Sequence, residues 1–164
     1  MSKTIHSSTI DLPFDQAPIP EYNGYSSEDI SKLAGQKEVS SHVCMLKKGQ
    51  YSCPYHFHHN AEEIFVILEG KGQLRTPGKI QVVEKGDSIF FEKGKEGAHQ
   101  LRNDQNEDLV YLDIKVQTSF DVCEYPDTGK VNLIGKEIFE KGKPIDYFAG
   151  EESLKEIWDT WERA

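Results

Sequence analysis

Residues 54–63 read Pro54-Tyr55-His56-Phe57-His58-His59-Asn60-Ala61-Glu62-Glu63, and the apolar run Ile64-Phe65-Val66-Ile67-Leu68 follows directly. Half of the six histidines in the chain fall within this stretch, next to two glutamates. His56 and His58 are two residues apart, so in an extended strand their side chains point to the same face. Two imidazoles on one face with a carboxylate nearby can bind a divalent metal ion. This stretch is therefore a candidate metal site within a β structure.

From residue 38 onward the chain is a series of short apolar segments separated by turn residues. Short, regularly spaced segments of this kind favour a sandwich or barrel over βαβ units. We therefore predict an all-β fold, with Phe65, Ile67, Phe90 and Phe91 in its core. The expected strands are Val39–Leu46, Ile64–Leu68, Gln73–Thr76, Ile80–Val83, Ser88–Phe91, Ala98–Leu101 and Leu109–Val116.

Both ends of the chain differ from this β region. Residues 1–35 contain three prolines and are expected to form an irregular arm on the core or on a partner subunit, with a short helix over Ser26–Leu33 capped by Ser26 or Ser27. Residues 36–135 form the expected barrel core. Residues 136–164 form a C-terminal extension with a helix over Ser153–Glu162. Its packing stripe consists of Leu154, Ile157, Trp158 and Trp161.

Composition limits the classes of function. A chain of 164 residues suits one domain, and its net charge of -9 argues against a nucleic-acid partner. No apolar run has transmembrane length, and the N-terminus lacks the apolar core of a secretory signal, so we expect no membrane partner. Three cysteines without close spacing predict neither a disulfide framework nor a zinc knuckle. We expect a cytoplasmic protein.

A second cluster, residues 86–103, contains His99, and the two clusters together resemble the motifs of the cupin superfamily. The first motif, G-x5-H-x-H-x(3,4)-E-x6-G, is matched by His56, His58, Glu63 and Gly70, with Gly49 one residue too far upstream. The second, G-x5-P-x-G-x2-H-x3-N, is matched by Gly86, Gly94, His99 and Asn103. Here Glu92 replaces the usual proline, and two extra residues lie between Gly94 and His99. The resemblance extends to about residue 116.

The resemblance implies a double-stranded β-helix, the jelly-roll barrel of cupins, with one divalent metal ion inside. His56 and His58 would come from one strand, Glu63 from its hairpin partner, and His99 from a strand distant in sequence. Three imidazoles and one carboxylate leave two positions of an octahedral ion open, which suits Fe, Mn or Ni, and Zn can bind there as well.

Several polar residues compete for roles at this site. Spacing to Gly70 favours Glu63 over Glu62 as the ligand, and strand alternation turns His59 away from His58. His6 and His42 lie in other segments and are not expected to be ligands.

A pocket around the metal is expected to use polar residues on the neighbouring strands, namely Tyr51, Gln73, Arg75, Tyr111 and Asp113. If Arg75 faces inward, its guanidinium could bind a carboxylate or phosphate. Otherwise Arg75 and Asp113 are solvated strand residues, and alternation alone leaves the choice open.

The resemblance leaves two classes of function. Cupins with this ligand set, which include dioxygenases, isomerases and decarboxylases, suggest a metalloenzyme that acts on a small polar metabolite with dioxygenase- or isomerase-type chemistry. Small single-domain cupins, many described as uncharacterised or sugar-binding, suggest the alternative, a non-catalytic cupin that binds a sugar-like small molecule. Catalytic residues are not identified from the sequence. A homodimer is expected, because the apolar arm could cover a neighbour's sheet edge.

Overall fold

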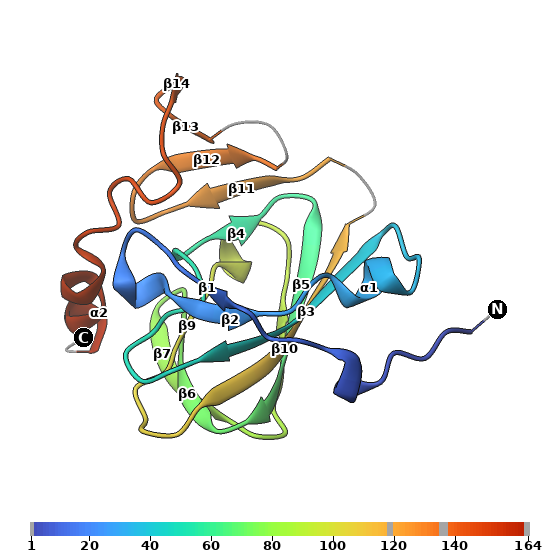
Figure 1. Cartoon of the computed structure of the whole chain (residues 1–164). Coiled ribbons are helices and arrows are strands. Elements are labelled where there is room, and N and C mark those ends of the chain that lie inside the picture. Colours follow the sequence, from blue (N-terminus) through green and yellow to red (C-terminus); the bar gives the residue numbers. More distant parts are fainter. Residues whose placement is uncertain (1, 118–119, 135–137, 163–164) are drawn as a thin grey trace.

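Three antiparallel sheets build the molecule (Figure 1). The computed structural model describes residues 2–117, 120–134 and 138–162. The first sheet has the order β1-β2-β3-β10-β5-β8, with strands Phe14–Asp15, Gly24–Ser26, Val39–Leu46, Leu109–Gln117, Ala61–Glu69 and Ser88–Phe91. The second has the order β14-β13-β12-β11-β4, with strands Lys143–Pro144, Ile138–Glu140, Lys130–Leu133, Val122–Tyr125 and Phe57–His58. The third has the order β7-β6-β9, with strands Lys79–Glu84, Lys71–Thr76 and Gln100–Arg102.

Helical structure is short. The α-helices are α1, Ile30–Leu33, and α2, Leu154–Glu162, and single 3-10 turns occur at Ser7–Thr9, Pro20–Tyr22 and Lys95–Gly97. In the part of the chain that the structure describes, no helix is long and apolar enough to cross a membrane. The predicted all-β jelly-roll barrel with an N-terminal arm and a C-terminal helix is confirmed.

The core lies between the six-stranded and three-stranded sheets. Strict alternation along β5 turns Ala61, Glu63, Phe65 and Ile67 inward, so the strand that fills the core also delivers a carboxylate to it. The buried apolar residues of this core are Leu46, Phe65, Ile67, Leu74, Val83, Phe91, Leu101, Leu109 and Tyr111.

The predicted strands are all present, two of them with the predicted bounds. Val39–Leu46 and Ser88–Phe91 coincide with β3 and β8, whereas β5, β6 and β7 extend beyond their apolar centres and β9 starts two residues later than predicted. Phe90 was wrongly placed in the core: it is 72% exposed, because it alternates with the buried Phe91 on β8.

The N-terminal arm adds β1 and β2 to the edge of its own six-stranded sheet, next to β3. The predicted helix cap was wrong. Ser26 belongs to β2, and Asp29 caps α1 by accepting hydrogen bonds from the backbone N–H groups of Ser31 and Lys32. The helix therefore starts at Ile30.

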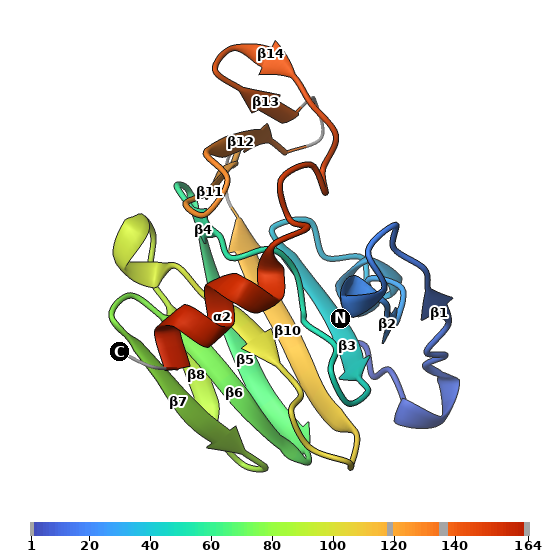
Figure 2. The same ribbon diagram turned by 90° about the vertical axis from the view of Figure 1, so that its left-hand side faces the viewer.

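Helix α2 lies across the outer face of the three-stranded sheet (Figure 2). Leu154 and Trp158 of the predicted stripe are buried, and the indole Nε1 of Trp158 donates a hydrogen bond of 2.6 Å to Oε1 of Gln100 on β9. The aromatic stripe thus anchors the C-terminal extension to the barrel.

Two motif glycines predict unequal costs of substitution. Both have positive φ, +75° at Gly70 and +99° at Gly86, but only at Gly70 would a Cβ meet backbone, at 2.2 Å from Asp108 O. We expect Gly86→Ala to lower the free energy of unfolding by about 1–2 kcal/mol from φ strain alone. Gly70→Ala should cost about 2 kcal/mol more, because the clash adds to the strain. Urea unfolding of the two variants checks this difference, and equal costs would contradict it.

Candidate metal centre

Four polar side chains from separate segments converge inside the barrel. His58 lies on β4 and Glu63 on β5, while His56 and His99 lie just outside strands and pair with each other in an isolated antiparallel bridge. All four side chains are buried, with residue exposures of 7% for His56, 5% for His58, 5% for Glu63 and 0% for His99.

The donor atoms face one another. Oε2 of Glu63 lies 3.1 Å from Nε2 of His99, 3.2 Å from Nε2 of His58 and 3.8 Å from Nε2 of His56. Nε2 of His56 is 3.2 Å from Nε2 of His58. Metal–ligand bonds of about 2.1 Å place neighbouring donors about 3 Å apart, so these separations suit a single ion between the four residues.

The other ring nitrogen of each histidine is held from behind. Nδ1 of His56 donates to the backbone oxygen of Pro54 at 3.0 Å, and Nδ1 of His99 donates to the backbone oxygen of Gly97 at 2.9 Å. In His58 it lies 2.5 Å from the carboxylate of Asp121. Such partners fix the tautomer of metal-binding imidazoles and leave the lone pair of Nε2 for the ion.

Two of the donor atoms are in a state that suits a bound cation. In the described part of the chain, Oε2 of Glu63 and Nε2 of His99 are buried without any hydrogen-bond partner. Buried polar atoms without partners are costly, and a cation between them would satisfy both. Three imidazoles and one carboxylate fit Fe, Mn, Ni or Zn in the divalent state.

The electrostatics of the cluster concentrate one negative charge on Glu63. Burial alone would raise its pKa, but the adjacent imidazoles of His99, His58 and His56 hold it well below the usual range. Burial lowers the pKa of His56 to about 3, with help from the nearby His99. Burial would also lower the pKa of His58, but its contacts with Cys123 and Glu63 raise it to about 10. A bound cation would replace the proton on His58 as the positive charge next to Glu63.

The expected hairpin between the histidine strand and the Glu63 strand was wrong. β4 pairs with β11 in the five-stranded sheet, whereas β5 lies between β10 and β8 in the six-stranded sheet. His59 and Asn60 connect strands of different sheets, so His58 and Glu63 approach from two walls of the barrel.

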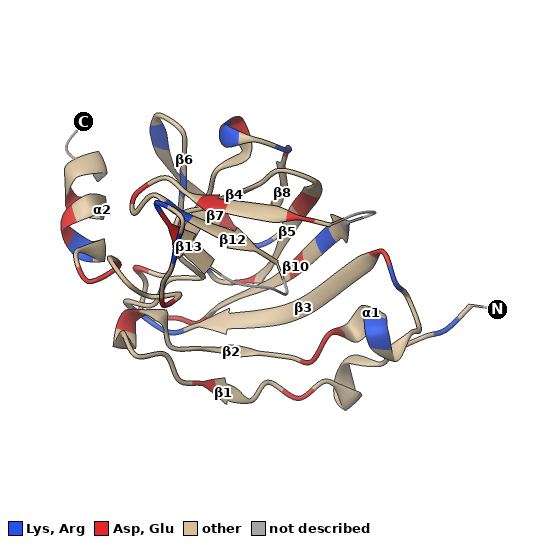
Figure 3. Ribbon diagram, turned by 90° about the horizontal axis from the view of Figure 1, so that it is seen from above, with Lys and Arg blue, Asp and Glu red and all other residues tan. Residues whose placement is uncertain are grey.

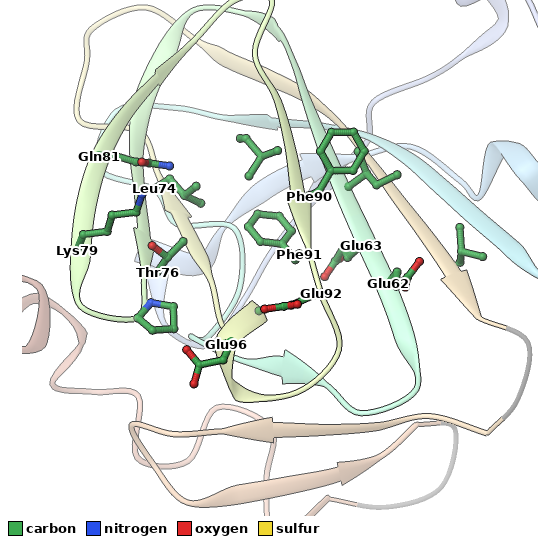
Figure 4. Close-up of a pocket in the computed structure, with 15 residues that line it drawn as sticks. Glu62, Glu63, Leu74, Thr76, Lys79, Gln81, Phe90, Phe91, Glu92 and Glu96 are labelled. Atoms are coloured by element: carbon green, nitrogen blue, oxygen red, sulfur yellow. The ribbon is translucent and has the colours of Figure 1, made fainter.

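The structure separates the competing residues. Glu62 is exposed and lies on the opposite face of β5 from Glu63, which points toward Phe91 (Figure 4). His59 is also exposed, and its Nε2 lies 2.7 Å from Oε1 of Glu124. His42 binds the backbone oxygen of Ser27 through Nδ1, and His6 lies in the arm, so neither joins the cluster.

A cavity of about 350 Å³ opens beside the donors. Of the predicted pocket residues, Tyr51, Tyr111 and Asp113 line it together with His56, His58 and Glu63. A volume of this size suits a small metabolite.

Gln73 and Arg75 do not line this cavity, which corrects the prediction. Alternation on β6 turns Leu74 into the core and the two polar residues to the outer face, under α2. Arg75 is neither a ligand-binding residue of this cavity nor solvated. Its NH1 and NH2 groups donate to Asp127 at 2.7 and 2.8 Å, and its guanidinium stacks 4.0 Å from the ring centre of Tyr55.

The sequence did not identify the contribution of residues 121–125. This segment leads into β11, which forms a hairpin with β12 through a turn at residues 126–129. Asp121 holds His58, Sγ of Cys123 lies 3.1 Å from Nδ1 of His58, and the ring of Tyr125 stacks on His56 at 5.9 Å. The motif contained no signal for these residues, because they lie outside it.

A second cavity, of about 660 Å³, lies on the other side of Glu63, between β8 and the β6–β7 hairpin (Figure 4). Phe91 forms part of the wall of this second cavity and stacks on His99, with ring centres 3.6 Å apart. The donors His56, His58 and Glu63 line the 350 Å³ cavity, which we treat as the candidate ligand site.

Comparisons with known proteins agree with this geometry. Residues 42–115 match the family model described as a cupin domain. A proposed sugar phosphate isomerase from Acidithiobacillus ferrooxidans is 24% identical, with a TM-score of 0.71 over 90% of this chain and 93% of that chain. A sugar phosphate isomerase of the cupin superfamily from Silicibacter pomeroyi is 17% identical, with a TM-score of 0.74 over 88% of this chain and 97% of that chain.

A predicted oxalate decarboxylase from Thermotoga maritima is 22% identical, with a TM-score of 0.59 over 70% of this chain and 99% of that chain. At these identities the likeness concerns the fold. Residues 42–115 thus match a cupin domain, and the barrel shares the fold of the cupin-superfamily structure from Silicibacter pomeroyi.

Proposed function

We propose that this protein is a metal-dependent enzyme that transfers a proton on a small polyhydroxy carbonyl compound, a reaction of the isomerase type. The observation that carries the proposal is the carboxyl group of Asp113, which shares one cavity with three of the four converging donors. The names of two similar structures, both called sugar phosphate isomerases, support the same class of chemistry.

His56, His58, Glu63 and His99 would hold one divalent ion, of Mn, Fe, Ni or Zn. Such an ion polarises a carbonyl or hydroxyl oxygen as a Lewis acid. The residues of the chain supply the rest: Pro54, Gly97 and Asp121 fix the three imidazoles, so the donor geometry exists before a ligand enters.

Asp113 is the proposed proton-transfer group. It lies on the inward face of β10 and lines the same cavity as Glu63. Burial raises the pKa of its carboxyl well above the usual range, and the negative charge of Glu63 adds to this effect. A cation on Glu63 would offset the second contribution and bring the pKa of Asp113 down toward the range of a general base.

Tyrosine rings form much of the cavity wall. Tyr22 and Tyr25 come from the N-terminal arm, Tyr125 from β11, and Tyr147 from the C-terminal extension. Such rings combine apolar faces with hydroxyl groups, which suits a polyhydroxy ligand.

Metal binding is tested by removing donors one at a time. His56→Ala and His99→Ala should each weaken the binding of added Mn²⁺ or Co²⁺ by about 100-fold or more, because a ligand matters at least as much as its supporting partners. His59→Ala serves as the matched control and should bind like the parent protein. Elemental analysis after reconstitution and dialysis gives the metal content. Equal loss in all three variants, or a parent protein that retains no metal, would contradict the assignment.

Proton transfer is tested by exchange of carbon-bound hydrogen with D₂O in small keto sugars and keto acids, followed by NMR. Asp113→Asn should slow the exchange by the metal-loaded protein about 100-fold or more. Its metal content should stay unchanged, and Asp11→Asn, at an exposed position in the arm, should exchange normally.

Two other outcomes of this assay would replace the proposal. Oxygen uptake without hydrogen exchange would point to the dioxygenase-type chemistry that the sequence also allowed. Ligand binding with neither reaction would favour the non-catalytic sugar-like binding cupin.

Cytoplasmic location and a homodimer remain proposals with their own support. Cys44, Cys53 and Cys123 are free thiols, which suits a reducing compartment. Ile64 and Phe90 are paired across β5 and β8 on the outer face of the six-stranded sheet, where Phe90 is exposed. Light scattering at micromolar concentration should give the mass of two chains, and the mass of one chain would overturn the homodimer.

A further inference from the structure

Strand β10 presents three polar side chains in a row to the cavity. Tyr111, Asp113 and Lys115 alternate with the outward residues of the strand, and all three line the 350 Å³ cavity. Lys115 lies nearest the end of the strand, from which the chain continues toward the β11–β12 hairpin (Figure 1).

Lys115 is adjacent to the metal donors. It is the Cα partner of Glu63 across the β10–β5 ladder, so both side chains leave neighbouring strands on the same face. Among the described residues, no hydrogen bond or ion pair fixes its ammonium group, although its charge acts on the nearby carboxyl of Asp113. A half-buried cation thus faces the cavity beside Glu63 and Asp113.

The cavity presents one ammonium group to a ligand. Among the described residues that line it, Lys115 is the one lysine or arginine, beside the imidazoles of His56 and His58 and the carboxyl groups of Asp15, Glu63 and Asp113. Basic residues elsewhere are interspersed with acidic ones along the ribbon (Figure 3).

The arginines of the barrel do not add to this charge. Arg75 is bound on the outer face by Asp127, and Arg102 lies over the rings of Tyr51 and Trp158. A phosphate dianion is usually bound by several cations or by a row of backbone N–H groups. A single ammonium group instead matches a carboxylate.

The remaining walls suit hydroxyl groups. Ser26, Ser52 and Asn132 line the cavity along with six tyrosines: Tyr22, Tyr25, Tyr51, Tyr111, Tyr125 and Tyr147. Hydroxyl and amide groups can donate to or accept from alcohols, and aromatic rings pack on C–H faces.

We propose that Lys115 is the specificity-determining residue of this site, and that it selects small polyhydroxy acids with a single carboxylate over neutral polyols and over sugar phosphates. This inference rests on the proposed function for its cavity and metal ion. It narrows the substrate class, and it departs from the phosphorylated substrates that the names of the two similar structures suggest.

Three probes with one carbon skeleton test the inference: gluconate, sorbitol and sorbitol 6-phosphate. Isothermal titration of the Mn²⁺-loaded protein should show gluconate binding about 10- to 100-fold more tightly than sorbitol, the value of one charge-assisted hydrogen bond. Sorbitol 6-phosphate should bind no better than sorbitol. Lys115→Met, which keeps the apolar stem, should reduce gluconate binding to the level of sorbitol and leave sorbitol binding unchanged.

Two further variants complete the test. Lys115→Arg should retain the preference for gluconate, and Lys71→Met, at an exposed position on β6, should behave like the parent protein. The inference is overturned if gluconate binding does not depend on Lys115, if sorbitol 6-phosphate binds as tightly as gluconate, or if none of the three probes binds. Metal content and hydrogen exchange, measured on the same samples, report separately on the proposed function.

Discussion

The structure depends on the burial of Glu63 opposite three imidazoles. An ionised carboxylate inside a barrel is very unfavourable unless it is paired, and here Nε2 atoms surround it at 3.1–3.8 Å. The same constraint fixes much of the fold. β5 must present Glu63 in register with its core residues Phe65 and Ile67, and the His56–His99 bridge must bring two distant segments together. A divalent ion bound here would offset the free-energy cost of burying the Glu63 carboxylate.

The site is completed by parts of the chain outside the matched cupin domain. Asp121 holds His58 from the start of the β11–β12 hairpin, and a buried ion pair connects that hairpin to the C-terminal extension. Nζ of Lys130 lies 2.7 Å from Oε1 of Glu151, and the hydroxyl of Tyr22 donates to Oε2 of the same carboxylate at 3.0 Å. A buried ion pair of this kind adds little to the free energy of unfolding, but it fixes how the hairpin and the C-terminal extension pack together. The arm, hairpin and extension thus contact one another and together line the cavity.

The sequence predicted what local spacing determines. Motif spacing to Gly70 distinguished Glu63 from Glu62, period-two alternation distinguished His58 from His59, and the turn glycines marked the boundaries between consecutive strands. It could not predict which face of β6 is inward, because Gln73 and Arg75 are as polar as cavity residues but lie under α2. It also did not identify Asp121 or Cys123, since their contact with His58 crosses more than sixty residues and follows no motif. The sequence did not identify Lys115 as a pocket residue, because its position opposite Glu63 depends on the pairing of β10 with β5.

We expect one divalent ion to bind among His56, His58, Glu63 and His99. Anomalous diffraction at the Mn or Ni absorption edge, from crystals of the reconstituted protein, would locate the ion. We predict one strong peak within about 2.0–2.3 Å of the three Nε2 atoms and of the Glu63 carboxylate. A peak bound elsewhere, or no peak at this point in crystals that contain the metal, would contradict it.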